Sequence, residues 1–109
     1  MIEIYFVEDN DLINFEAISK GYRNDVYVKV NDKFYKTAVY SIVRLGQDFA
    51  SESKAYGYYS IEPNLILVND VEKKEIVYTI EKLNTQRYFD YLKPLDSEGI
   101  EGLELIKIN

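Results

Sequence analysis

The stretch DVYVKVNDKFYKTAVYSIVRL, residues 25–45, determines the fold that we expect for this chain. Valine alternates with other residues over 26–30, and a second β-rich run covers 34–40, which predicts two strands. The Asn31-Asp32-Lys33 segment between them is short, and Asn and Asp tolerate the backbone angles that tight turns require. These residues therefore predict a β-hairpin.

A helix is expected to follow the hairpin directly. Ser41 can cap its first turn, and Gly57 stands where a glycine commonly ends a helix. Its apolar residues at helical spacing are Ile42, Leu45, Phe49 and Tyr56. We expect this stripe to face the core. Gly46 weakens the helix by about 1 kcal/mol relative to alanine, which a close contact between helix and sheet would explain.

The next apolar run, residues 65–68, is continuous, which is typical of a strand buried on both faces in the middle of a sheet. Asn69, with Glu72 three residues later, forms a capping-box pattern and predicts the start of a second helix. The stripe expected to be buried on that helix comprises Ile76, Val77, Ile80 and Leu83.

The N-terminal residues 2–7 alternate and predict a first strand. Residues 12–20 are open to two interpretations. Their weak alternation favours an irregular strand, whereas Asn10 or Asp11 could equally cap a short helix there.

Towards the C-terminus, residues 85–92 predict a short helix with Phe89 and Leu92 turned inward, and residues 103–108 predict a last strand. The whole order indicates one α+β domain over residues 1–109. We expect a mixed or antiparallel sheet of about five strands, with the two main helices packed on one face.

Composition restricts the possible functions. The chain has no cysteine and no histidine, so disulfides, thiolate metal sites and histidine-based catalysis are excluded, and we expect no enzyme, cofactor or metal site. Nineteen acidic against 13 basic residues give a net charge of −6, which disfavours nucleic acid and favours a basic partner. No signal peptide or membrane-length apolar run is present, so we expect a cytoplasmic protein without membrane contact.

The most unusual segment is YGYYSIEPN, residues 56–64, in a chain that contains 11 tyrosines. Tyr58 and Tyr59 are adjacent, so an extended backbone points them in different directions and at least one should reach the surface. An exposed aromatic group rimmed by acids is a plausible site for a basic protein surface. The predicted partner-binding residues are Tyr56, Tyr58, Tyr59, Glu52 and Glu62. The alternative is a simple turn shaped by Pro63 and Asn64.

Three stretches together resemble a known family. They are the strand–turn–strand–helix of residues 25–45, the strand and helix NLILVNDVEKKEIVYTIEKL of residues 64–83, and the aromatic tail RYFDYL of residues 87–92. This arrangement is similar to the small acidic immunity proteins of bacterial polymorphic-toxin systems. The resemblance implies a non-catalytic protein that binds a cognate toxin and blocks its active site. The toxin is often a nuclease, whose basic cleft an acidic surface would complement.

A second possibility is a small structural or regulatory α+β module, with two copies joined through a sheet edge. The strand over Phe34–Tyr40 would supply that edge. An enzyme that works through paired carboxylates is a third possibility, although no spacing in the sequence indicates such a pair.

Overall fold

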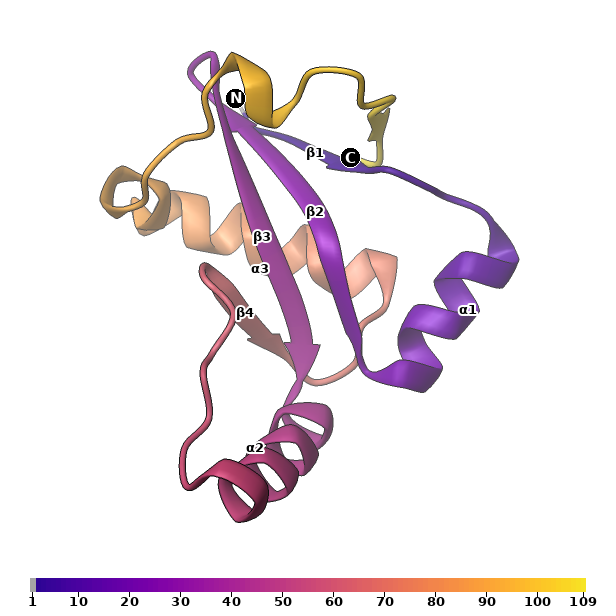
Figure 1. Cartoon of the computed structure of the whole chain (residues 1–109). Helices are drawn as coiled ribbons and strands as arrows, with labels where there is room; N and C mark the ends of the chain where they lie inside the picture. Colours follow the sequence, from indigo (N-terminus) through magenta and orange to yellow (C-terminus); the bar gives the residue numbers. More distant parts are fainter. Residues whose placement is uncertain (1) are drawn as a thin grey trace.

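The computed structural model describes residues 2–109, which form an α+β fold around a mixed sheet (Figure 1). The strands are β1 (Ile2–Phe6), β2 (Tyr22–Val30), β3 (Lys33–Ser41), β4 (Leu65–Val68) and β5 (Ile106–Lys107). The helices are α1 (Asp11–Lys20), α2 (Ile42–Tyr56) and α3 (Lys73–Thr85), followed by 3-10 turns at Tyr88–Tyr91 and Ser97–Gly99. The sheet order is β4-β3-β2-β1-β5, and only the β3–β4 pair is parallel within these residues. The predicted fold class is confirmed.

The central hairpin forms as the sequence predicts. Asn31 and Asp32 both have positive φ, 50° and 67°, which is the geometry of a two-residue turn that matches the twist of its strands. Val28 pairs with Tyr35 in the antiparallel register. β2 begins earlier than expected, at Tyr22, because an irregularity between Arg23 and Val26 lets the strand continue past a break in its pairing.

The core lies between the sheet and α3. Ile76 and Ile80 of α3 are completely buried, and Val77 and Leu83 pack against them, so the predicted stripe of this helix is confirmed. Phe89 is also buried, as expected, and its ring lies 5.4 Å from that of Tyr35. One helix and the 3-10 turn after it therefore close this face of the sheet.

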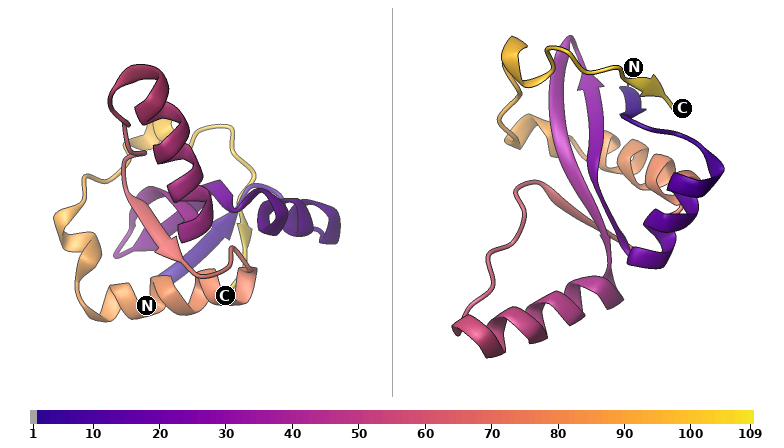
Figure 2. Two further views of the ribbon diagram at one scale, coloured as in Figure 1. Left: turned by 90° about the horizontal axis from the view of Figure 1, so that it is seen from below. Right: turned by 45° about the vertical axis from the view of Figure 1, so that its right-hand side comes forward.

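The first long helix behaves differently, because α2 extends away from the sheet (Figure 2). None of the residues Ile42–Tyr56 has a buried side chain. Its caps are as predicted, since the Ser41 side chain accepts a hydrogen bond from the Arg44 N–H and Gly57 ends the helix at φ 81°. The expected packing of its apolar stripe onto the sheet is wrong. The helix starts directly at the end of β3 and runs beyond the sheet.

Gly46 has no close neighbour, so the contact that was expected to explain it is absent; a Cβ there would meet no atom within 4 Å. We expect Gly46→Ala to raise the free energy of unfolding by about 1 kcal/mol, because alanine gains helix propensity without a clash. Gly57→Ala is the matched control. Its Cβ would also meet open space, but its φ of 81° disfavours alanine by about 1–2 kcal/mol. Urea denaturation measures both free energies of unfolding. A change of the same sign in the two variants would contradict this prediction.

The β4 strand lies at the edge of the sheet, which corrects its predicted central place. Ile66 and Val68 are buried, whereas Leu67 points outward and is 45% exposed. One face of this apolar strand packs into the core, and the other face remains partly uncovered. β3 lies between β2 and β4, and β4 pairs with it over Ala38–Ser41. That part of the Phe34–Tyr40 strand offers no free edge, and a dimer contact through the remaining part stays a prediction.

Residues 12–20 form a helix, so the preferred interpretation as an irregular strand is wrong. Asn10 caps this helix by accepting a hydrogen bond from the Ile13 N–H at 2.9 Å. At its other end Gly21 adopts a left-handed conformation, at φ 78°. The two caps override the weak alternation of the sequence between them.

Two other predicted boundaries move. α3 begins after Glu72 rather than after Asn69, so the predicted capping box is wrong. Glu75, in the first turn of α3, bonds to the residues before the helix instead: its carboxylate accepts hydrogen bonds from the N–H groups of Asn69 and Asp70. The last strand is shorter than expected and pairs only Ile106 and Lys107 with β1. Within residues 2–109, no helix combines the length and hydrophobicity needed to cross a bilayer.

Candidate partner-binding surface

The five predicted binding residues lie on α2 and on the connection from α2 to β4. Tyr56 and Tyr58 are 70% and 68% exposed, on either side of the helix-ending Gly57. Glu52 and Glu62 are exposed as well, and Tyr59 is half-buried. Tyr58 and Tyr59 therefore have different environments, as their adjacency predicts.

Tyr59 ties the connection back to the helix. Its ring meets that of Phe49 edge to face, with centroids 6.4 Å apart. Such a pair adds roughly 0.5–1.5 kcal/mol beyond the area it buries. The Gly57 N–H donates to the Ser53 carbonyl at 2.8 Å, which closes the last turn of α2. Helix and connection thus form one projecting unit, residues 42–62, which we name the arm.

The phenols of Tyr40 and Tyr59 lie near acidic side chains and near Arg44. Burial raises the pKa of Tyr59, and the negative charges of Asp48, Glu52 and Glu62 raise it further. Burial also raises the pKa of Tyr40, with added effects from Glu62, Tyr59 and Asp48. Both phenols stay protonated at neutral pH and can donate hydrogen bonds. The fold therefore places Glu52 and Glu62 close enough to Tyr59 to act on its charge.

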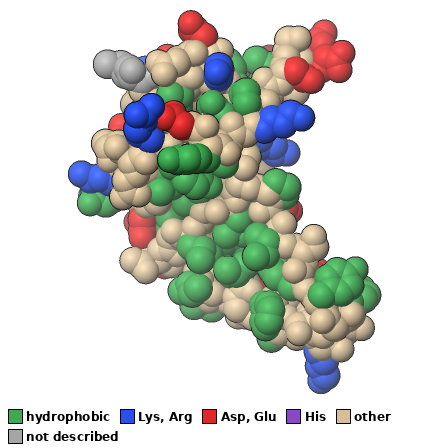
Figure 3. Space-filling model, turned by 90° about the vertical axis from the view of Figure 1, so that its left-hand side faces the viewer, with side chains coloured by type: hydrophobic (Ala, Val, Ile, Leu, Met, Phe, Trp, Pro, Cys, Tyr) green, Lys and Arg blue, Asp and Glu red, His purple; other side chains and the backbone are tan. Residues whose placement is uncertain are grey.

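The structure adds apolar residues that were not predicted as binding residues. Figure 3 shows hydrophobic side chains gathered over the lower part of the molecule, where the arm and β4 lie. The exposed large hydrophobic residues of α2, the connection and β4 include Ile42, Val43, Phe49, Ile61 and Leu67. Ile42 and Phe49 belong to the stripe that was assigned to the core, so the sequence signal was present but was interpreted as packing. We name Phe49, Tyr56, Tyr58, Tyr59 and Ile61, with Glu52 and Glu62, the arm surface.

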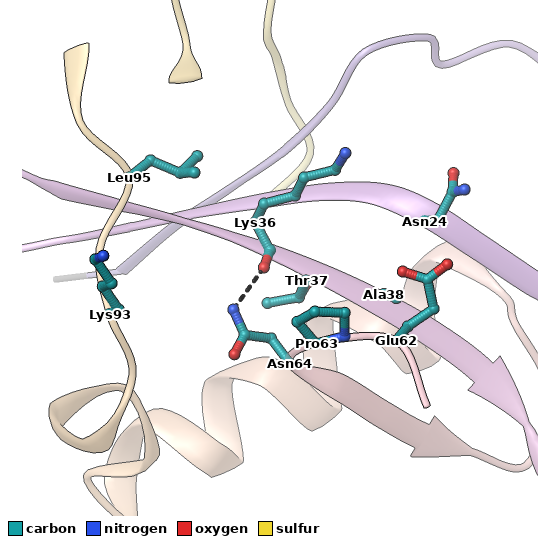
Figure 4. Close-up of a pocket in the computed structure, with 9 residues that line it drawn as sticks. All are labelled: Asn24, Lys36, Thr37, Ala38, Glu62, Pro63, Asn64, Lys93 and Leu95. Carbon is teal, nitrogen blue, oxygen red and sulfur yellow. Dashed lines mark hydrogen bonds between the residues drawn. The ribbon is translucent and has the colours of Figure 1, made fainter. Parts of the chain in front are cut away.

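A pocket of about 280 Å³ lies where the connection joins the sheet (Figure 4). The Asn64 side-chain amide donates to the Lys36 carbonyl at 2.9 Å. The backbone carbonyl of Asn64 accepts from the Ala38 N–H at 3.3 Å. Asn64 has a φ of 57°, which this residue type tolerates well. Pro63 and Asn64 therefore do shape the entry to β4, as the alternative interpretation proposed, while Tyr56 and Tyr58 before them remain exposed.

The charged groups of the pockets are mixed in sign. Glu62 is the carboxylate lining the pocket of Figure 4, where Lys36 and Lys93 accompany it. A smaller pocket beside α1 is lined by Glu16 and Asp25 together with two cations, and Asp25 pairs there with Arg23 at 3.5 Å. Across residues 2–109, no cluster of three or more acidic, histidine or cysteine side chains is placed to hold a metal ion.

Comparison with known proteins adds no relative to this description. No protein-family model matches the chain, and no curated protein or solved structure matches it. The functional argument therefore depends on the geometry of the arm.

Proposed function

We propose that this protein is a non-catalytic binding protein, and specifically an immunity protein that neutralises a cognate bacterial toxin. The observation that carries the proposal is the arm. Its helix has no buried side chain, and its aromatic residues Phe49, Tyr56 and Tyr58 remain exposed. Monomeric proteins rarely leave contiguous apolar surface uncovered, and larger patches commonly mark interaction sites.

The charge of the arm surface favours a basic toxin domain. Asp48, Glu52 and Glu62 raise the pKa of Tyr59 and Arg44 acts in the opposite sense, so acids outnumber bases around this ring. The protein as a whole carries a charge of −6. Complementary charge accelerates association and suppresses wrong partners. A nuclease domain, with a substrate cleft that must attract phosphate, is the class of toxin that such a surface suits best.

Tyrosines are well suited to the contact itself. Tyr56 and Tyr58 each present a large ring on a side chain with only two rotatable bonds, so binding orders little. Exposed rings of this kind are typical of the residues that dominate interface energy.

The proposal is tested with the protein encoded by the neighbouring gene. We expect the tagged chain to co-purify with that protein and to suppress its toxicity in cells. The variant Tyr56→Ala, Tyr58→Ala, Glu62→Ala removes three exposed side chains and should weaken binding at least about tenfold, measured by titration calorimetry.

The matched control is Tyr78→Ala, Tyr91→Ala, which removes two tyrosines that are also exposed but lie away from the arm, on α3 and the following turn. Its affinity should equal that of the unaltered chain. A neighbour without toxicity would contradict the immunity function. Full binding by the arm variant would show that the partner contacts another surface.

A further inference from the structure

The arm leaves the sheet without a loop, so its direction depends on the first turn of α2. β3 ends at Ser41, and the next residue already belongs to α2. α1 ends at the same end of the hairpin, because β2 begins directly after it, at Tyr22, and pairs there with Tyr40 (Figure 2). The end of α1 and the start of α2 therefore meet. We name residues 20–22 and 41–44 the joint.

Arg44, in the first turn of α2, connects three elements at the joint. Its guanidinium donates a hydrogen bond at 2.9 Å to the carbonyl of Lys20, the last residue of α1. The guanidinium also lies over the ring of Tyr22 on β2, 4.6 Å from the centroid, and it pairs with Asp48 of α2 at 2.9 Å. The last carbonyls of a helix lack partners within the helix, and a cation is favourable beside them. One side chain thus ties α2 to both α1 and β2.

The backbones at the joint are in close contact. The Ser41 N–H donates to the Gly21 carbonyl at 2.8 Å, and the Ser41 hydroxyl accepts from the Arg44 N–H at 3.2 Å. A Cβ added to Gly21 would meet the Cβ of Arg44 and the hydroxyl oxygen of Ser41, each at 2.8 Å. That is well inside the roughly 3.5–4.0 Å of favourable contact between carbon atoms. The joint therefore leaves little room for α2 to turn towards α1.

We propose that Arg44 is a positioning residue, which fixes the direction of the arm relative to the sheet. α2 has no buried side chain, so it lacks the side-chain packing that usually orients a helix, and the contacts of its first turn take that role. They set the direction of α2 and not its resistance to local opening. A surface already held in its bound orientation loses less freedom on binding. This consequence for affinity rests on the proposed function, whereas the fixed direction does not.

The test compares Arg44→Met with the unaltered chain by residual dipolar couplings of the backbone amides in a weakly aligned sample. Methionine is nearly as good a helix former as arginine, so α2 should stay helical, which secondary chemical shifts verify. We expect the couplings of α2 to shrink by at least about a third relative to those of α3, because motion of the whole helix averages them. Arg44→Lys should recover part of this loss, since lysine keeps the charge but lacks the planar group.

Lys54→Met is the matched control, because it also removes one positive charge from α2, at an exposed position in the last turn. It should leave the couplings unchanged. Arg44→Met should bind the protein encoded by the neighbouring gene about three- to tenfold more weakly than Lys54→Met does.

Unchanged α2 couplings in Arg44→Met would overturn the positioning role and would mean that the connection to β4 alone holds the arm. Smaller couplings with an unchanged affinity would overturn its consequence for binding. A neighbouring protein that the unaltered chain does not bind would contradict the proposed function instead, and the couplings would still decide whether Arg44 fixes the direction of the arm.

Discussion

Replacing Arg23 by alanine is expected to lower the free energy of unfolding by about 3–5 kcal/mol, the range found when one partner of a buried charged network is removed. Arg23 is buried on β2, and its guanidinium lies 3.5 Å from the centroid of the Phe6 ring. It donates hydrogen bonds to the Asn14 side chain at 2.8 Å and to the Glu8 carbonyl, and it pairs with Asp25 at 3.5 Å. Urea denaturation measures the loss.

The cost is large because two effects add. Truncation leaves space beside Phe6, and it leaves the Asn14 side chain and the Glu8 carbonyl without their donor. The fold removes this cation from water, since Arg23 is buried; burial lowers the pKa of Arg23, while Asp25, Asp9 and Glu8 act in the opposite sense. Since Asn14 belongs to α1, we also expect the variant to lose helix content selectively at residues 11–20.

Arg87→Ala is the matched control. Arg87 pairs with Asp90 at 2.7 Å, a shorter contact than that of Arg23 with Asp25, but its side chain is 82% exposed. Water and salt screen such a pair, so we expect a change of less than about 0.5 kcal/mol. An equal cost for the two variants would mean that burial of the Arg23 network contributes nothing.

The parts of the fold set by local chemistry could be predicted from the sequence. Asn31 and Asp32 fixed the hairpin turn, and Ser41 with Gly57 fixed both ends of α2. Each depends on one or two residues with strong local backbone or capping preferences. The stripe of α3 was predictable too, because its apolar spacing is regular and charged residues occupy its other faces.

Two of the errors concern what lies opposite an apolar face. Residues 65–68 are continuous and apolar, yet they form an edge strand with Leu67 outward. The stripe through Phe49 has helical spacing, yet α2 carries it away from the sheet. Periodicity identifies an apolar surface but does not say whether the same chain covers it.

The candidate site also has one part that local sequence predicts and another part that depends on the three-dimensional fold. That one of Tyr58 and Tyr59 reaches solvent followed from their adjacency alone. The participation of Phe49 and Ile61 could not be predicted, because it depends on α2 leaving the sheet. The acids at Glu52 and Glu62 were recognised in the sequence, but their shared effect on Tyr59 needed the fold of the connection.

Backbone amides of α2 are expected to exchange with deuterated solvent at least about 100 times faster than those of α3. The two helices have similar lengths, 15 and 13 residues, so length does not distinguish them. α3 buries Ile76 and Ile80 and can open only with the core, which for a domain costs roughly 5–15 kcal/mol. α2 buries no side chain, and an isolated helix of its length is only marginally stable in water.

Residue-resolved exchange followed by NMR measures this difference, and a bound partner supplies the decisive comparison. If the arm surface is where a toxin docks, α2 amides should become strongly protected in the complex while those of α3 change little, because docking adds the missing cover to Phe49 and Tyr56. Equal protection of α2 and α3 in the free protein would contradict the prediction. It would mean that α2 already unfolds with the core, and the arm would then need no partner to explain its exposed aromatic residues.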